Sequence, residues 1–288
     1  MKLEEEFVHS PACSGTIYHR RFHPGVKARS RVLLLHGLGD HVTSHDRIAE
    51  RLVSCGFEVH GFDWPGHGHS SGPSGDVPGV EAASRLISET VERGDLPATG
   101  VYGHSTGAFL LVHHLRLLKE QGRESGFRWA WMSSPLLSPG HGQPAWKKVL
   151  SRTLARVAPR LAFPTGVARW RICHAEEPGT LAGPEEFEGF HHVVSARFGH
   201  DLLAHEDLLD TCARHFPEDI RLLLTQGDED TICPPEFAIR FFEQAGAKDK
   251  TLAYFRGVRH DIFRETIRES FHATVRAWLE PEIDRDRD

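Results

Sequence analysis

The sequence lacks the segments that would direct a chain to a membrane or through one. Residues 1–6 carry no basic stretch followed by an apolar core, so we expect no secretory signal. No run of about eighteen apolar residues occurs, which argues against a membrane-spanning helix. The five cysteines are scattered and form no Cys-x-x-Cys pair, a pattern typical of free thiols in a reducing compartment. We therefore expect a cytoplasmic protein.

Excess positive charge is also missing. The 34 Lys and Arg residues stand against 40 Asp and Glu residues, which gives a formal net charge of −6. A basic surface for nucleic acid is therefore not expected. The composition, with 39% hydrophobic and 26% charged residues in a chain of 288, is ordinary for a globular protein with a substantial core.

A serine lies in a pattern of the type Gly-x-Ser-x-Gly, at residues 103–107. The short apolar run 99–102 precedes it, and the helix-like stretch 108–112 follows it. This strand–turn–helix context is typical of a nucleophile elbow, in which a sharp turn projects the serine oxygen beside a helix N-terminus. The flanking glycines are needed because a Cβ has no room at either position. We therefore predict that Ser105 is a nucleophile.

Apolar runs and helical periodicities alternate along most of the chain. Residues 1–25 are predicted to form a hairpin at a sheet edge, and the apolar run 31–35 suits a strand buried on both faces. Strands separated by helices predict an α/β fold, with a mostly parallel sheet flanked by helices. The later strands are expected at 57–62, 98–102, 127–132, 220–225 and 251–255, and the helices at 44–55, 78–93, 106–121, 235–245 and 262–279.

This alternation stops after the sixth predicted strand. Residues 136–217 are rich in Pro and Gly and contain two amphipathic stretches, 146–157 and 193–212. We interpret this segment as a helical cap inserted into the core. The core itself is predicted to consist of residues 1–135 and 218–288.

A nucleophilic serine needs a base to take its proton and an acid to orient that base. In folds with this turn, the partners follow in the order Ser, Asp, His, on loops after later strands. The Gly-x-x-Asp spacing from Gly227 favours Asp230 as the acid over the alternative Asp228. His260 lies on the loop after the last predicted strand, and an ordinary imidazole is largely neutral near pH 7. We predict that Asp230 and His260 complete a triad.

The oxyanion of a tetrahedral intermediate needs preorganised N–H donors. The residue after the nucleophile supplies one of them, which here is the backbone N–H of Thr106. The other comes from the loop after the strand 31–35, whose glycines let its backbone approach a substrate closely. We predict that Leu38 N–H is this second donor, and we expect a structural role for His36 in the same loop.

Six motifs together carry a family resemblance, at residues 36–41, 63–72, 103–107, 133–136, 226–230 and 260–263. At these residues the chain resembles the α/β-hydrolases, specifically the monoacylglycerol lipase and lysophospholipase-like group, also described as serine aminopeptidase-type hydrolases. The resemblance implies a Ser105–Asp230–His260 triad and an oxyanion hole at Leu38 and Thr106. It also implies a cap that shapes a tunnel for an acyl chain.

The chain departs from the family pattern around the expected substrate pocket. The family's elbow usually reads Gly-His-Ser-Met-Gly-Gly, whereas Thr106 and Ala108 replace the Met and the second Gly here. The pocket wall beside the serine is therefore expected to be more polar. The family's Asp-Pro element has no match around residues 179–192, where substrate choice is expected to be decided.

These observations predict a serine carboxylic-ester hydrolase that acts through an acyl-enzyme on monoacylglycerol or lysophospholipid-like esters. The alternative is an amidase or aminopeptidase on the same triad, with cap acids such as Glu176, Glu177, Glu185 and Glu186 holding a substrate amine. A non-catalytic binding module is disfavoured because all three triad residues are present.

Other features are weighed against simpler roles. We expect no metal or other cofactor, because the His-x-His at residues 67–69 is not followed by further ligands. Cys233 is interpreted as a small buried apolar group, with a reactive role as the alternative. The apolar positions of residues 146–163 either pack on the core or face a lipid interface, so peripheral membrane contact through the cap stays open. The sequence leaves the oligomeric state undecided.

Overall fold

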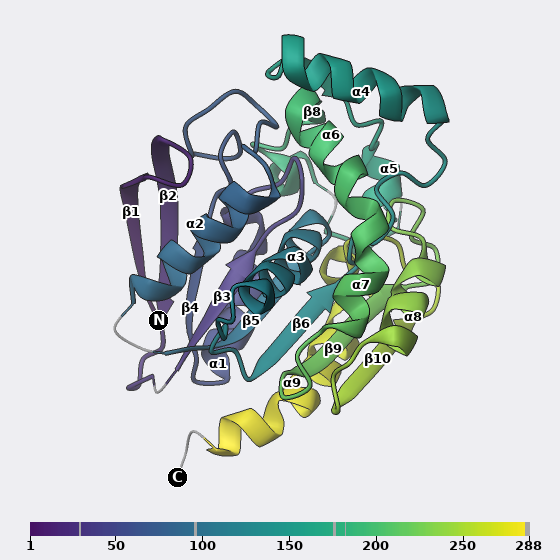
Figure 1. The fold of residues 1–288 in the computed structure, drawn as a ribbon. Helices are drawn as coiled ribbons and strands as arrows, with labels where there is room; N and C mark the ends of the chain where they lie inside the picture. The colour runs from purple at the N-terminus through teal and green to yellow at the C-terminus, as the bar shows by residue number, and fades with distance from the viewer. Residues whose placement is uncertain (29, 95–96, 175–176, 182, 286–288) are drawn as a thin grey trace.

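A computed structural model describes residues 1–28, 30–94, 97–174, 177–181 and 183–285. Within these residues, one eight-stranded sheet has the order β1-β2-β4-β3-β5-β6-β9-β10 (Figure 1). The β1–β2 and β2–β4 pairs are antiparallel, and all other neighbours are parallel. The predicted edge hairpin and mostly parallel sheet are therefore confirmed. The strands are β1 (Lys2–Ser10), β2 (Gly15–His23), β3 (Arg31–Leu35), β4 (Glu58–Phe62), β5 (Ala98–His104), β6 (Trp129–Ser133), β9 (Arg221–Gly227) and β10 (Lys250–Phe255).

Helices cover both faces of this sheet, which is why the central strands are continuous apolar runs. Every residue of β3, β5 and β6 is buried. Figure 1 shows α1 and α9 on one face, and α2, α3, α7 and α8 on the other. The bounds are α1 (Asp46–Ser54), α2 (Val80–Glu92), α3 (Thr106–Glu120), α7 (Leu209–Arg214), α8 (Pro235–Gln244) and α9 (Arg268–Arg285).

The segment between β6 and β9 projects above the carboxyl ends of the parallel strands (Figure 1). It contains α4 (Ala145–Val157), β7 (Ala162–Pro164), α5 (Arg169–Ile172), β8 (Val193–Ser195) and α6 (Ala196–His205). α4 packs on α6, and β7 pairs with β8 in a small antiparallel sheet. The chain then returns to the core through α7, which packs on α3 and α8.

Two predicted segments differ from the structure: the amphipathic stretch 193–212 is not one element, and the closing helix begins and ends six residues later than predicted. The stretch 193–212 divides into β8, α6 and α7. The stretch 262–279 divides into a short 3₁₀ turn (Ile262–Arg264) and α9, because Glu265 adopts extended backbone between them. The buried Glu265 carboxylate accepts hydrogen bonds from the backbone N–H groups of His174 and Arg259, so tertiary contacts interrupt the helix. No helix in the described ranges is long and apolar enough to cross a membrane.

Candidate active site

Ser105 occupies the turn in which β5 passes directly into α3. Its backbone has φ 50° and ψ −116°, a conformation that residues with a Cβ rarely adopt. A Cβ on Gly103 would lie 2.9 Å from Ala108 Cα, and a Cβ on Gly107 would lie 2.3 Å from the Leu35 carbonyl oxygen. The flanking glycines therefore permit the close packing that holds Ser105 in a strained turn at the carboxyl edge of the sheet.

Asp230 and His260 form a buried pair on the loops after β9 and β10. His260 Nδ1 lies 2.8 Å from Asp230 Oδ2, and the other Asp230 oxygen accepts the N–H groups of Ile232 and Cys233, each at 2.8 Å. Burial disfavours the imidazolium of His260. The charge of Asp230, the adjacent Cys233 and the hydrogen bonds to both outweigh this penalty, so the pKa of His260 stands well above its ordinary value.

Asp228 and Glu229, the two acids directly before Asp230 in the sequence, have other partners. Asp228 accepts the N–H groups of Gly257 and Val258, at 2.7 and 3.4 Å, and so holds the turn after β10. Glu229 Oε2 lies 3.1 Å from His174 Nε2 and is largely exposed. Of the three acids that follow β9, the structure therefore brings Asp230 to His260.

Ser105 and His260 both line a cavity of about 720 Å³ beneath the inserted segment. Asp230 lies behind His260 and does not line it. Cys233 lies beside the serine, with its Sγ 3.9 Å from Ser105 Oγ. Burial raises the pKa of the Cys233 thiol, and its side chain is 3% exposed, so it stays protonated and is shielded from solvent.

The loop after β3 passes directly over the serine. An added Cβ on Gly37 would lie 3.2 Å from Ser105 Cβ, and Gly39 has a φ of 79° that favours glycine. Leu38 and Thr106, the two predicted oxyanion donors, both line the cavity. The structure therefore brings these two residues and Ser105 to the same cavity.

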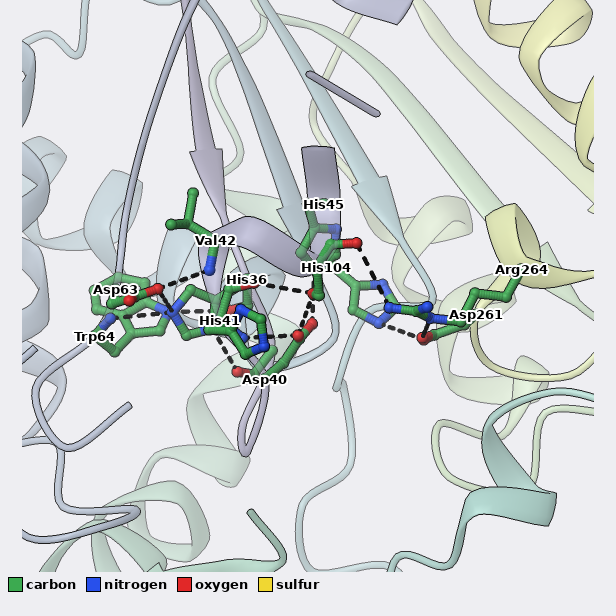
Figure 2. Close-up of polar contacts among 12 residues, drawn as sticks. His36, Asp40, His41, Val42, His45, Asp63, Trp64, His104, Asp261 and Arg264 are labelled. Atoms are coloured by element: carbon green, nitrogen blue, oxygen red, sulfur yellow. Dashed lines mark hydrogen bonds and ion pairs between the residues drawn. The ribbon is translucent and has the colours of Figure 1, made fainter. Parts of the chain in front are cut away.

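Buried side chains fix the shape of this loop (Figure 2). Asp40 accepts from the backbone N–H of His41 and from His45 Nε2, both at 2.7 Å. His36 Nε2 accepts the backbone N–H of Trp64 at 3.0 Å, which agrees with the structural role expected for it. Burial holds the pKa of His36 well below its ordinary value, so its imidazole is neutral, as an acceptor nitrogen requires.

Asp63, the first residue of the motif at 63–72, connects two loops near the serine, a structural role that the sequence analysis did not predict. Its Oδ1 accepts the N–H of Val42 at 2.7 Å (Figure 2), and its Oδ2 accepts the N–H of His69 at 2.8 Å. The carboxylate therefore links the loop after β4 to the loop over the serine. Because Asp63 is fully buried, these bonds compensate for its desolvation.

The walls of the cavity come mostly from the inserted segment, and they are mainly apolar. Their apolar side chains include Trp146, Leu150, Leu154, Phe163, Val167, Ile172, Phe190, Val194, Leu202 and Leu203. The described lining residues include two acids, Asp40 and Asp261, and both are buried against histidines. Polar side chains such as Gln143, Lys147 and Arg171 also line it, so the cavity combines apolar walls with polar groups, as a ligand with a polar and a long apolar part requires.

The acids considered as amine ligands are placed elsewhere or are already paired. Glu186 binds Arg264 at 2.8 Å and Arg47 at 3.0 Å. Glu177 and Glu185 do not line the cavity, and Glu176 lies outside the described residues.

Groups of side chains that could hold a metal ion occur in the described part of the chain. Asp230, Cys233 and His260 form one such group. Both Asp230 oxygens are already bound, one to two backbone N–H groups and the other to His260 Nδ1, so we assign no metal role to this group.

Sequence reasoning missed a second buried pair beside the first. His104 Nε2 lies 2.9 Å from Asp261 Oδ1, and Arg264 Nε lies 3.0 Å from Asp261 Oδ2 (Figure 2). The adjacent His260-Asp261 letters were the available signal. The sequence shows that Asp261 directly follows the predicted base, but it does not show which residue Asp261 binds. Only the fold places His104 next to it.

Comparison with known proteins gives consistent matches over most of the chain. Residues 26–267 match the hydrolase family model described as "Serine aminopeptidase, S33". The monoglyceride lipase of Saccharomyces cerevisiae is 25% identical over 275 residues, which cover 88% of this chain and 85% of that protein. An uncharacterized abhydrolase domain-containing protein of Dictyostelium discoideum is 28% identical over 280 residues. That match covers 93% of this chain but only 28% of the longer relative.

Solved structures agree with these matches. The crystal structure of a monoacylglycerol lipase from Paleococcus ferrophilus superimposes with a TM-score of 0.78 and is 28% identical. The alignment covers 91% of this chain and 98% of that one. The chain belongs to the serine aminopeptidase S33 family of α/β-hydrolases, and it is a lipase-like serine hydrolase.

Proposed function

We propose that this protein hydrolyses carboxylic esters through an acyl-enzyme formed on Ser105. His260 takes the proton of Ser105 Oγ as that oxygen attacks the ester carbonyl carbon, and it then donates the proton to the departing alcohol. A water molecule, deprotonated by His260, releases the acid and restores the serine. Asp230 orients the imidazole and stabilises its cationic form. The observation that carries this proposal is the strained Ser105 turn, which shares one cavity with His260, the imidazole that is paired with the buried Asp230.

The proposed oxyanion hole consists of the backbone N–H groups of Leu38 and Thr106. Thr106 is the first residue of α3, so its N–H is one of the helix-terminal donors that have no partner within the helix. Leu38 lies between two glycines on the loop that approaches Ser105 Cβ. Donors held in position before the reaction cost no reorganisation when negative charge develops, which is why they favour the transition state.

We propose monoacylglycerols or lysophospholipid-like esters as the substrate class. The cavity has room for one acyl chain along its apolar walls, while the polar groups around Ser105 can take the ester and a small alcohol. The relatives described as monoglyceride lipases support this choice. No described acid in the cavity is available for a substrate amine, so we do not propose the aminopeptidase alternative.

The experiment that tests this function combines labelling with turnover. A fluorophosphonate probe is expected to modify Ser105, located by mass spectrometry, and labelled protein is expected to lose activity on p-nitrophenyl esters of graded length. A folded protein that hydrolyses none of these esters, or that is labelled elsewhere and not at Ser105, would contradict the proposal.

We also propose that residues 136–217 act as a cap that contacts a lipid interface. Large apolar side chains on the segment are exposed, with Trp146 at 60%, Val149 at 71% and Val157 at 73%. Residues 139–174 contain seven Lys and Arg residues and no Asp or Glu, although the whole chain is acidic. The acids of the segment lie within residues 176–210, so the part that suits the surface of a membrane containing anionic lipid is 139–174, where exposed apolar groups occur with cations alone.

A further inference from the structure

A second histidine–carboxylate pair lies directly beside the proposed triad. His104 precedes Ser105 in the sequence, and Asp261 follows His260. The His104 Nε2 to Asp261 Oδ1 distance is 2.9 Å, and the two side chains are 3% and 4% exposed. The pair therefore joins the two chain segments that carry the serine and its base, at the positions immediately adjacent to them.

The topology of the sheet makes this link important. β5 carries Ser105 at its end, while the loop with His260 follows β10, and β6 and β9 lie between these two strands. Neighbouring strands are about 4.8 Å apart, so the loop must reach back roughly 14 Å across the sheet edge. β10 is an edge strand, whereas His104 is fixed within the sheet opposite Ser133 of β6. The loop therefore needs anchors on central strands to keep His260 in register with Ser105.

The loop has further anchors besides His104. Ser134 Oγ donates to the His260 carbonyl oxygen at 2.6 Å, and the Asp261 N–H donates to the Ile172 carbonyl oxygen at 2.8 Å. Arg264 pairs its Nε with the second oxygen of Asp261, and another of its nitrogens binds Glu186 at 2.8 Å. Of these contacts, the His104–Asp261 bond is the one that joins the residue next to the nucleophile with the residue next to the base.

We propose that His104 and Asp261 are positioning residues, whose bond sets the distance and orientation between Ser105 and His260. This inference rests on the proposed triad. Proton transfer requires the serine oxygen and the imidazole to lie within about 2.6–3.2 Å of one another, and a misplacement of about 1 Å can cost about a hundredfold in rate. A bond one residue away on each side restrains that separation.

The pair also has a defined charge state. Burial would raise the pKa of Asp261, but His104 and Arg264 outweigh it and lower this pKa to about 2. Burial lowers the pKa of His104. Near neutral pH, Asp261 is therefore ionised and His104 is neutral, with its Nε2–H donated to the carboxylate.

Asp261 adds a negative charge beside His260, in addition to that of Asp230. The titratable groups around this imidazole are Asp230 and Cys233 from the segment after β9, His104 from β5, and Asp261 on its own loop. Arg264 faces Asp261 and partly offsets its charge. Nearby negative charge favours the imidazolium, so removal of the Asp261 charge lowers the pKa of His260.

Paired substitutions separate this role from a general structural one. Asp261→Ala and His104→Leu break the bond, whereas Asp261→Asn keeps an acceptor and His104→Gln keeps a donor at the position of the imidazole Nε2. On a short soluble p-nitrophenyl ester, we expect the first two to lower kcat by about 10- to 100-fold with little change in KM. The conservative variants should recover much of that loss.

A pH profile provides the second readout. In Asp261→Asn, the acidic limb of kcat/KM should move to lower pH, because the base loses a neighbouring negative charge. The proposal is overturned if Asp261→Ala and His104→Leu keep kcat within about threefold of wild type. It is also overturned if the conservative variants lose as much as the disruptive ones, or if the acidic limb does not move.

Folding and the proposed function are checked independently. Circular dichroism and thermal melting identify variants that fail to fold, and if Asp261→Ala does so, the His104 pair and the Asp261→Asn profile still decide the outcome. Fluorophosphonate labelling of Ser105 in the wild-type protein tests the triad separately. Labelling at Ser105 together with fully active His104 and Asp261 variants would remove this inference and leave the proposed function intact.

Discussion

Helices α3 and α4 both carry apolar side chains, but those of α3 are mostly buried and those of α4 are not. α3 buries eleven of its fifteen residues between the sheet and its neighbouring helices, and it begins directly after the proposed nucleophile. α4 has no buried residue, and Trp146 and Leu150 line the cavity while remaining exposed. The core helix therefore uses its apolar atoms to hold one geometry, whereas the cap helix leaves them available for a substrate or an interface.

This difference between core and inserted segment assigns the proposed catalytic residues to one and the choice of substrate to the other. Ser105, Asp230 and His260 are all buried and come from loops of the core. The walls that an acyl chain would meet come mostly from the inserted segment. Substitutions in the core should therefore lower turnover of every ester, and substitutions in the cap should change which esters or surfaces the protein prefers.

The strongest test of the core is Ser105→Ala. We expect turnover of short and long esters to fall by about 10⁴-fold or more, because the acyl-enzyme can no longer form. The far-UV circular dichroism and the melting temperature should stay close to wild type, since a single hydroxyl is removed. Residual activity above a few per cent of wild type, assayed with p-nitrophenyl esters, would assign the nucleophile elsewhere.

The two nearby aspartates provide a matched comparison within the core. Asp230→Asn should lower kcat by roughly 10³- to 10⁴-fold, because His260 loses the partner that orients it. Asp228→Asn should have a small effect, since Asp228 accepts the N–H groups of Gly257 and Val258. Steady-state kinetics of both purified variants decide the assignment, and an exchange of the two outcomes would make Asp228 the acid.

The pH dependence should reflect the raised pKa of His260. Ester cleavage needs the neutral imidazole, so kcat/KM should fall as pH decreases through the pKa of His260 in the free enzyme. Because Asp230 holds this pKa well above the ordinary value near 6.5, the fall should occur at higher pH than for an isolated histidine. A pH–rate profile with an acidic limb below that ordinary value would contradict the electrostatic account of the pair.

Leu154 tests the role of the cap in substrate selection. Leu154→Trp adds volume to the cavity wall, so kcat/KM for long-chain esters should fall about tenfold while short-chain esters are little affected. Val157→Trp is the control, because Val157 lies on the same helix, is 73% exposed and does not line the cavity. Equal losses on short and long esters would place the effect outside an acyl-chain site.

The smallest effect concerns the cap surface. In a Ser105→Ala background, Arg156→Gln should weaken binding to vesicles of phosphatidylcholine and phosphatidylglycerol about fivefold, since one cation near an anionic surface contributes about 1 kcal/mol. Arg85→Gln, at an exposed position on α2, is the control and should bind like the parent. Vesicle sedimentation measures both, and binding that does not depend on the anionic lipid would exclude charge recognition by the cap.

Local patterns predicted much of the core. The turn around Ser105 was predictable from the glycines on both sides of the serine, between a strand and a helix. A turn this sharp leaves no room for a Cβ at those two positions, so the requirement is visible in the local sequence. The buried strands were predictable because continuous apolar runs reflect coverage on both faces. The interruption at Glu265 was not predictable, because its buried carboxylate accepts the backbone N–H of His174, 91 residues away in the sequence, as well as that of Arg259.

The sequence by itself determined the order of strands and helices, the strained serine turn and the residue types available for acid–base chemistry, since these depend on neighbours along the chain. Tertiary structure decided that His104 bonds to Asp261, that Asp63 supports the loop over Ser105, and that α4 leaves its apolar side chains exposed. Each of these depends on which distant segments meet at the carboxyl edge of the sheet. These contacts are set by the packing of the whole chain. The periodicity of apolar residues in a helix predicts that it has an apolar face, but not which surface that face will contact.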